Sequence, residues 1–203
     1  MMSFGRYSLF AAALVACSSV VANAADVVDT CDTSWSGLYV GAHAGYVTGK
    51  GDYGPDTVNI DGFMGGGLAG YNYQTCNLVL GLEGDFGIGE VDGNNFGAGI
   101  NDWDLEPNGH IRARLGLPMD SFMPFVAAGL ALGDIDVNTG PGPNDGGMHY
   151  GFTGGAGLDM KLNENIIVRG EYLFDAYGSK SNPGGDTSAN THTLRAALIW
   201  QFN

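Results

Sequence analysis

Apolar and polar residues alternate with a period of two in several stretches of this chain. From Leu78 to Ile88 every second residue is apolar or glycine, whereas Glu83 and Asp85 lie in the intervening row. The same alternation recurs in Ile166–Tyr177 and in Leu194–Phe202. Successive side chains of a strand point to opposite faces. Each stretch therefore predicts a strand with one apolar face and one face of charged or small residues.

Eight strands are predicted in this way, at 35–48, 59–73, 78–90, 104–117, 123–134, 149–162, 166–177 and 191–203. Their connections alternate in length. They are tight near 74–77, 118–122 and 163–165, but long, polar and glycine-rich near 49–58, 91–103, 135–148 and 178–190. Short turns at one end and long loops at the other are typical of outer-membrane barrels. The predicted fold class is all-β, an eight-stranded antiparallel up-and-down transmembrane β-barrel.

The charged row distinguishes a membrane barrel from a soluble one. A soluble sandwich or a lipocalin-like carrier turns apolar side chains inward and charges outward. In a membrane barrel the apolar row faces lipid. Acids and bases are balanced in the charged row, and isolated charges in so narrow an interior would be costly. We therefore expect a barrel-interior ion network formed by Glu83, Asp85, Arg112, Arg114, Asp159, Lys161, Arg169, Glu171, Asp175 and Arg195.

A glycine-rich stretch, Gly62–Tyr73, contains glycines at the spacing G-x-G-x-x-G. A dinucleotide site would need a helix that opens on the last glycine. The residues that follow are instead turn-like and then alternate with period two. These glycines are interpreted as architectural, relieving crowding inside a narrow barrel and permitting strand curvature.

The first residues read as an export signal. Arg6, an apolar core at Leu9–Ala16 and the small-residue site Ala22–Ala24 predict a signal peptide over residues 1–24 and one barrel domain over 25–203. A lipobox-like stretch ending at Cys17 is the alternative, with acylation of that cysteine. With 22 acidic against 8 basic residues, the chain has no basic patch suited to nucleic acid.

Several motifs together resemble the outer membrane protein beta-barrel family of Gram-negative bacteria, which includes OmpA-like domains, opacity-type antigens and porin-like proteins. The resemblance rests on Trp35–Tyr46, Gly66–Gln74, Gly81–Phe86, Arg112–Gly116, Met123–Ala131 and Val168–Leu173. It implies an eight-stranded barrel in contact with outer-membrane lipid. Asn203 departs from the aromatic residue on which such barrels often finish.

The up-and-down topology places the start of the first strand and the end of the second at one rim. Cys31 and Cys76 lie at these positions. In an oxidising compartment an even cysteine count favours a disulfide over a metal site. A Cys31–Cys76 disulfide is therefore expected, with two free thiols as the alternative.

Other candidate sites are weaker. His110, His149 and His192 fall near predicted extracellular strand ends, so a hemin or zinc site there is one hypothesis, although scattered histidines, His43 included, more often form hydrogen bonds. Asp134–Asp145 imitates a calcium loop but has Thr139 where glycine is needed. Loose binding of divalent cations by acidic loops remains an option. His192 with Thr191, Thr193 or Ser188 is the only candidate set for catalysis, and no carboxylate is placed to orient it.

We interpret the chain as a non-enzymatic protein of the outer membrane with a structural and surface-antigen role, needing no cofactor or metal. Side chains fill the interior of an eight-stranded barrel, which argues against an open general pore. A small porin-like channel and a hemin-binding surface protein are the alternatives.

Overall fold

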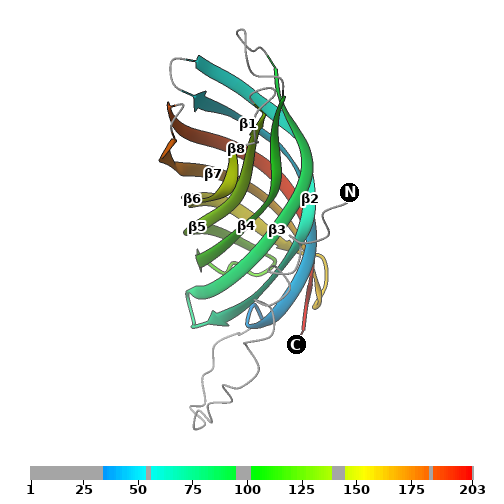
Figure 1. The fold of residues 1–203 in the computed structure, drawn as a ribbon. Helices are drawn as coiled ribbons and strands as arrows, with labels where there is room; N and C mark the ends of the chain where they lie inside the picture. Colours follow the sequence, from blue (N-terminus) through cyan, green and yellow to red (C-terminus); the bar gives the residue numbers. More distant parts are fainter. Residues whose placement is uncertain (1–33, 54–55, 95–101, 139–144, 183–184, 203) are drawn as a thin grey trace, which may run out of the picture. The chain divides into compact units, whose positions relative to one another are not determined.

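The computed structural model describes residues 34–53, 56–94, 102–138, 145–182 and 185–202. At the strand ends opposite the short turns it describes the backbone only. Its strands are β1 (Gly37–Tyr53), β2 (Asp56–Gln74), β3 (Val79–Asn94), β4 (Asp102–Gly116), β5 (Phe122–Asn138), β6 (Asp145–Lys161), β7 (Ile166–Asn182) and β8 (Gly185–Gln201). Each strand pairs antiparallel with the next, and β1 pairs with β8, which closes the barrel (Figure 1). The predicted fold is confirmed. Within the described residues no helix is long and apolar enough to cross a membrane.

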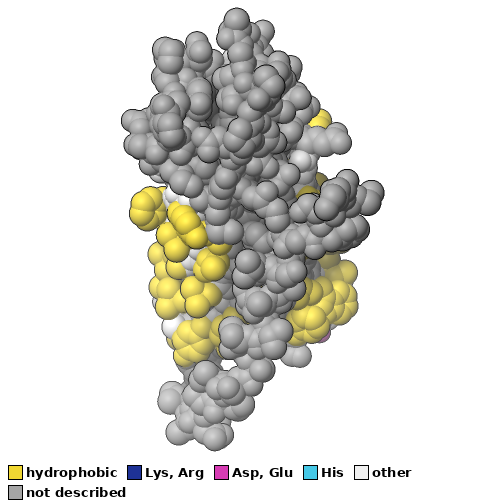
Figure 2. Space-filling view, viewed as in Figure 1, with side chains coloured by type: hydrophobic (Ala, Val, Ile, Leu, Met, Phe, Trp, Pro, Cys, Tyr) yellow, Lys and Arg dark blue, Asp and Glu magenta, His cyan; other side chains and the backbone are white. Residues whose placement is uncertain are grey.

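The two rows of each strand face the sides that alternation predicts. Leu80, Phe174 and Leu198 are exposed on the outer surface, whereas Arg169 and Arg195 are buried inside. Where Figure 2 shows described side chains on the side of the barrel, they are mostly hydrophobic. An exposed apolar outside around a buried charged inside is the arrangement of a lipid-embedded barrel. The soluble alternatives are therefore wrong.

The strands extend further than the sequence pattern indicates. The long loop expected near residues 49–58 is mostly strand, because β1 runs to Tyr53 and β2 begins at Asp56. Residues 134–138 likewise continue β5, so the first part of the calcium-like stretch Asp134–Asp145 is strand rather than loop. Backbone pairing therefore continues beyond the point where the hydrophobic alternation of the sequence ends. Strands of 15 to 19 residues exceed the roughly 9–11 that span a bilayer.

The glycines of β2 allow its inner face to approach neighbouring groups. A Cβ atom on Gly66 would overlap the Phe86 carbonyl and lie 2.9 Å from the Gly87 Cα. A Cβ on Gly70 would overlap the Tyr39 ring and lie 2.7 Å from the Leu82 carbonyl oxygen. These positions therefore exclude any side chain, as the architectural interpretation expects.

Candidate functional site

Glu83 lies at the centre of the ion network inside the barrel. One carboxylate oxygen contacts Arg112, and the other lies 2.5 Å from Arg169 Nη1 and accepts a hydrogen bond of 2.8 Å from the Tyr39 hydroxyl. Arg112 also lies 2.6 Å from Glu171. Both charged ends of these pairs are fully withdrawn from solvent, and Arg112 is 0% exposed. The network thus fills the middle of the barrel with interlocked side chains.

The remaining arginines connect to the same network. Arg114 lies 2.8 Å from Asp159, and Arg169 lies 2.6 Å from another oxygen of that carboxylate. Both guanidinium groups also lie over the Phe125 ring, at 4.0 and 4.9 Å from its centroid. Arg195 lies 2.8 Å from Glu171 and 3.2 Å from Asp85. Each ion is stabilised by several opposite charges. A single buried pair offsets the loss of hydration of its two charges poorly.

His110 joins the network inside the barrel, although its place in the sequence predicts a position near the extracellular strand end. Its Nδ1 lies 2.7 Å from Asp85 and its Nε2 lies 3.4 Å from Asp175. Lys161, which was expected in the network, lies half-buried at the end of β6 instead. Its ammonium donates a hydrogen bond to the Ser34 carbonyl and lies 4.7 Å from the Trp35 ring centroid.

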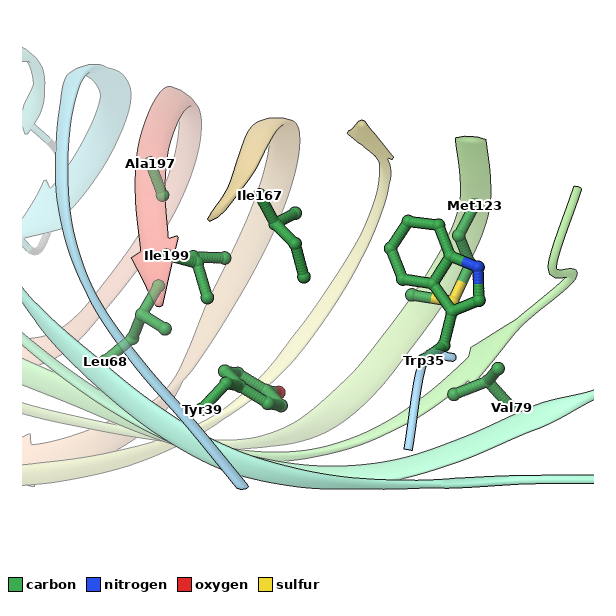
Figure 3. Close-up of a cluster of buried hydrophobic side chains, with 8 residues drawn as sticks. All are labelled: Trp35, Tyr39, Leu68, Val79, Met123, Ile167, Ala197 and Ile199. Atoms are coloured by element: carbon green, nitrogen blue, oxygen red, sulfur yellow. The ribbon is translucent and has the colours of Figure 1, made fainter. Parts of the chain in front are cut away.

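The Trp35 side chain closes the end of the barrel that carries the short turns. It is 1% exposed and belongs to an interior apolar cluster with Val79, Met123, Ile167 and other residues (Figure 3). Its backbone N–H donates to Gln74 Oε1 at 2.9 Å. Gln201 donates to the Ser34 and Ser36 carbonyls at 2.9 and 2.8 Å. The segment 34–36 therefore plugs this end, which we call the Trp35 plug.

The structure does not bring the candidate histidines together. His110 and His43 are buried inside the barrel, and His43 Nε2 lies 3.1 Å from the Phe86 carbonyl oxygen. His192 is exposed on the outer face, with Nδ1 2.6 Å from the Tyr172 hydroxyl. The His149 side chain is outside the described part. His110 and His192 cannot share a ligand, because the barrel wall separates them.

The candidate catalytic set around His192 is also separated. Thr191 and Thr193 are buried on the inner face, whereas His192 faces outward. The Ser188 side chain is outside the described part. The acidic side chains at the far strand ends are outside it too, so divalent-cation binding there stays a prediction.

Cys76 lies in the turn between β2 and β3, and Cys31 lies outside the described residues. The disulfide and the signal peptide likewise stay predictions.

A lipid-facing barrel with a charged, filled interior matches one family of known proteins. The outer membrane protein beta-barrel domain model matches residues 9–202. The chain belongs to this family. Related proteins carry the name of outer-membrane proteins, and the fold is that of an outer-membrane barrel. This chain is therefore an integral protein of the outer membrane.

Curated relatives agree with this assignment. The chain is 32% identical to the 25 kDa outer-membrane immunogenic protein of Brucella abortus biovar 1 (strain 9-941) over 174 residues, covering 83% of this chain and 80% of that protein. It is 35% identical to the 22 kDa outer membrane protein of Rhizobium leguminosarum bv. viciae over 147 residues, covering 72% and 66%.

A solved structure shares the fold. The chain superposes on Neisserial surface protein A with a TM-score of 0.58 and 20% identity, covering 82% of this chain and 98% of that one. At this level of identity the likeness concerns the fold alone. It supports the eight-stranded, closed architecture of the family member described here.

Proposed function

We propose that this protein is a closed structural barrel of the outer membrane that presents its outer strand ends as a surface antigen. The observation that carries the proposal is the filled interior. Arg112 contacts Glu83 on β3 and Glu171 on β7, and all three side chains are fully withdrawn from solvent. The relatives called immunogenic in Brucella support the antigen role. The interior supports a structural role, since it leaves no wide aqueous path.

Recording from planar bilayers tests the closed barrel. The full-chain protein, refolded and inserted into the bilayer, is expected to give no steady steps of large conductance. Trp35→Ala removes the side chain that closes one end, but the ion network still blocks the middle. We therefore expect no large steps from this variant either. Steady large steps from the unaltered protein would overturn the proposal in favour of a porin-like channel.

We also propose that the barrel is not an enzyme. Support comes from His192, whose described hydroxyl partner is Tyr172, while the neighbouring Thr191 and Thr193 face the interior. The candidate nucleophiles Thr191 and Thr193 therefore lie on the opposite face from His192, whereas a nucleophile needs its base within hydrogen-bond reach. Lipid A extracted from cells that overproduce the protein is expected to be unchanged in acyl-chain number. Loss or gain of an acyl chain would contradict this.

A further inference from the structure

The outer surface of β8, β1 and β2 changes from apolar to polar at one register row. Tyr46 pairs with Leu194 on one side and Phe63 on the other, and all three are exposed. The next row toward the far end pairs His192, Thr48 and Asp61, and the row after it pairs Asn190, Lys50 and Asn59. These residues are exposed too. The change marks the outer boundary of the lipid-facing belt.

At this boundary the His192 Nε2 atom and the Lys50 ammonium have no partner among the described residues. His192 is held by Tyr172 through its Nδ1, and its ring centroid lies 5.1 Å from that of Phe174, so Nε2 remains for another group. Lys50 is exposed, and its ammonium forms no ion pair or hydrogen bond with a described side chain. Lys50 and His192 are diagonal neighbours across the β1–β8 pair, a spacing of about 7–8 Å. One ligand can therefore contact both.

Exposed positive charge is scarce among the side chains that the structure describes. Of its 8 lysines and arginines, four arginines are buried with carboxylates. Lys161 lies at the opposite end, beside the Trp35 plug. Among residues whose side chains are described, Lys50 is the base on the outer face at the far boundary. A lipid headgroup anion beside this acidic barrel would be attracted by the positive charge of Lys50.

We propose that Lys50, His192, Thr48, Asn190 and Asn59, the β8–β1 patch, bind the phosphorylated sugar headgroup of an outer-leaflet glycolipid. The occupant follows from position, because the patch continues the lipid-facing surface at headgroup level. Lys50 pairs with a phosphate and His192 Nε2 with a phosphate or sugar oxygen, while the acyl chains lie along Leu194 and Tyr46. This inference rests on the proposed closed barrel, whose outer face lies against lipid.

Asp61 supplies a discriminating variant. It lies opposite Thr48 and accepts a hydrogen bond of 2.8 Å from the Tyr46 hydroxyl. A carboxylate at this place repels a directly bound phosphate. Asp61→Asn is therefore expected to tighten glycolipid binding. If a divalent cation bridged Asp61 to the phosphate, the same substitution would weaken it.

Native mass spectrometry of the full-chain protein in uncharged detergent, with a chelator present, tests the patch. The probe is lipid A, a glycolipid with a bis-phosphorylated disaccharide, compared with dephosphorylated lipid A. Lys50→Gln is expected to weaken lipid A binding about fivefold, the effect of roughly one lysine near an anionic surface. His192→Ala is expected to weaken it, whereas Asn77→Asp, in the β2–β3 turn at the opposite end, lowers net charge equally and is expected to leave it unchanged.

Four results would overturn the proposal: no loss of affinity in Lys50→Gln, equal binding of dephosphorylated lipid A, a requirement for divalent cations together with weaker binding by Asp61→Asn, or displacement of lipid A by millimolar inorganic phosphate. Gel mobility of unheated against boiled samples is measured for every variant. A heat-dependent shift shows that the barrel is closed, so loss of glycolipid binding is distinguishable from failure of the fold.

Discussion

Glu83 accommodates the positive charges that crowd the middle of the barrel. Arg112 and Arg169 contact its two oxygens, and Arg114 and Arg195 lie within 3.6 and 3.8 Å. Without this carboxylate the guanidinium groups would face one another in a medium that screens charge poorly. A buried charge is tolerated here because each ion has several partners.

Glu83→Gln is the sharpest test of the network. The amide keeps the shape but removes the charge, so we expect the free energy of unfolding to fall by about 3–5 kcal/mol, as for other broken buried pairs. Urea titration of the detergent-folded barrel measures it. Glu164→Gln, in the exposed β6–β7 turn, serves as the control and is expected to change stability by about 0–1 kcal/mol. Equal effects of the two substitutions would show that the network contributes little.

His110 carries a second prediction at this scale. Both ring nitrogens face carboxylates, at 2.7 Å from Asp85 and 3.4 Å from Asp175. A carboxylate accepts hydrogen bonds, whereas a neutral imidazole has one nitrogen without hydrogen. We therefore expect both nitrogens to be protonated at neutral pH. Nitrogen-15 NMR of the ring checks this, and a signal from an unprotonated ring nitrogen would refute it. His110→Gln is expected to cost about 1–3 kcal/mol of stability.

At the scale of the strand, alternation predicted the membrane-spanning part but not its extent. Leu80 and Glu83 reveal the two faces of β3 because one meets lipid and the other meets ions. Backbone pairing requires no alternation of side chains, so β1 and β2 remain paired where the alternation of the sequence ends. The far segments of β1 and β2 therefore read as loops in the sequence and are strands in the structure.

The glycines of β2 and β7 provide a matched pair of substitutions. Gly66→Ala would place a Cβ against the backbone of β3, whereas a Cβ on the outward Gly170 would meet nothing within 4 Å. We expect Gly66→Ala to lower the free energy of unfolding by about 1–3 kcal/mol, the range for overpacking. Gly170→Ala is expected to stay within about 0.5 kcal/mol. The fraction of heat-resistant folded band on gels ranks the two variants, and a larger loss for Gly170→Ala would contradict the account.

At the scale of the whole molecule, the inside-out arrangement could be predicted, but two interior contacts could not. Lys161 and His110 both lie in the row that faces inward, and the sequence alone does not reveal height along the barrel. Lys161 lies at the rim, where Ser34 and Trp35 engage it, whereas His110 lies between two carboxylates. The Trp35 plug could not be predicted because the pattern places Trp35 at the start of the first strand, whereas the structure begins β1 at Gly37 and packs Trp35 inside the barrel end.

The proposed Cys31–Cys76 disulfide would join the segment preceding the Trp35 plug to the β2–β3 turn. We expect intact-mass analysis without reductant to find both thiols protected from alkylation. A bond that closes a loop of this size stabilises by about 2–4 kcal/mol. Reduction, or Cys76→Ser, should therefore lower the urea midpoint. Alkylation of both cysteines without reductant would contradict the bond.

β1 and β2 remain paired well past the lipid boundary. The part that leaves the membrane is therefore a two-stranded ribbon whose facing backbone groups are already hydrogen-bonded to each other. Host antibodies that meet an intact bacterium would then recognise shape rather than linear peptide. Serum raised against boiled protein is expected to bind living cells poorly, and vaccine preparations that preserve the native tube are expected to outperform denatured ones.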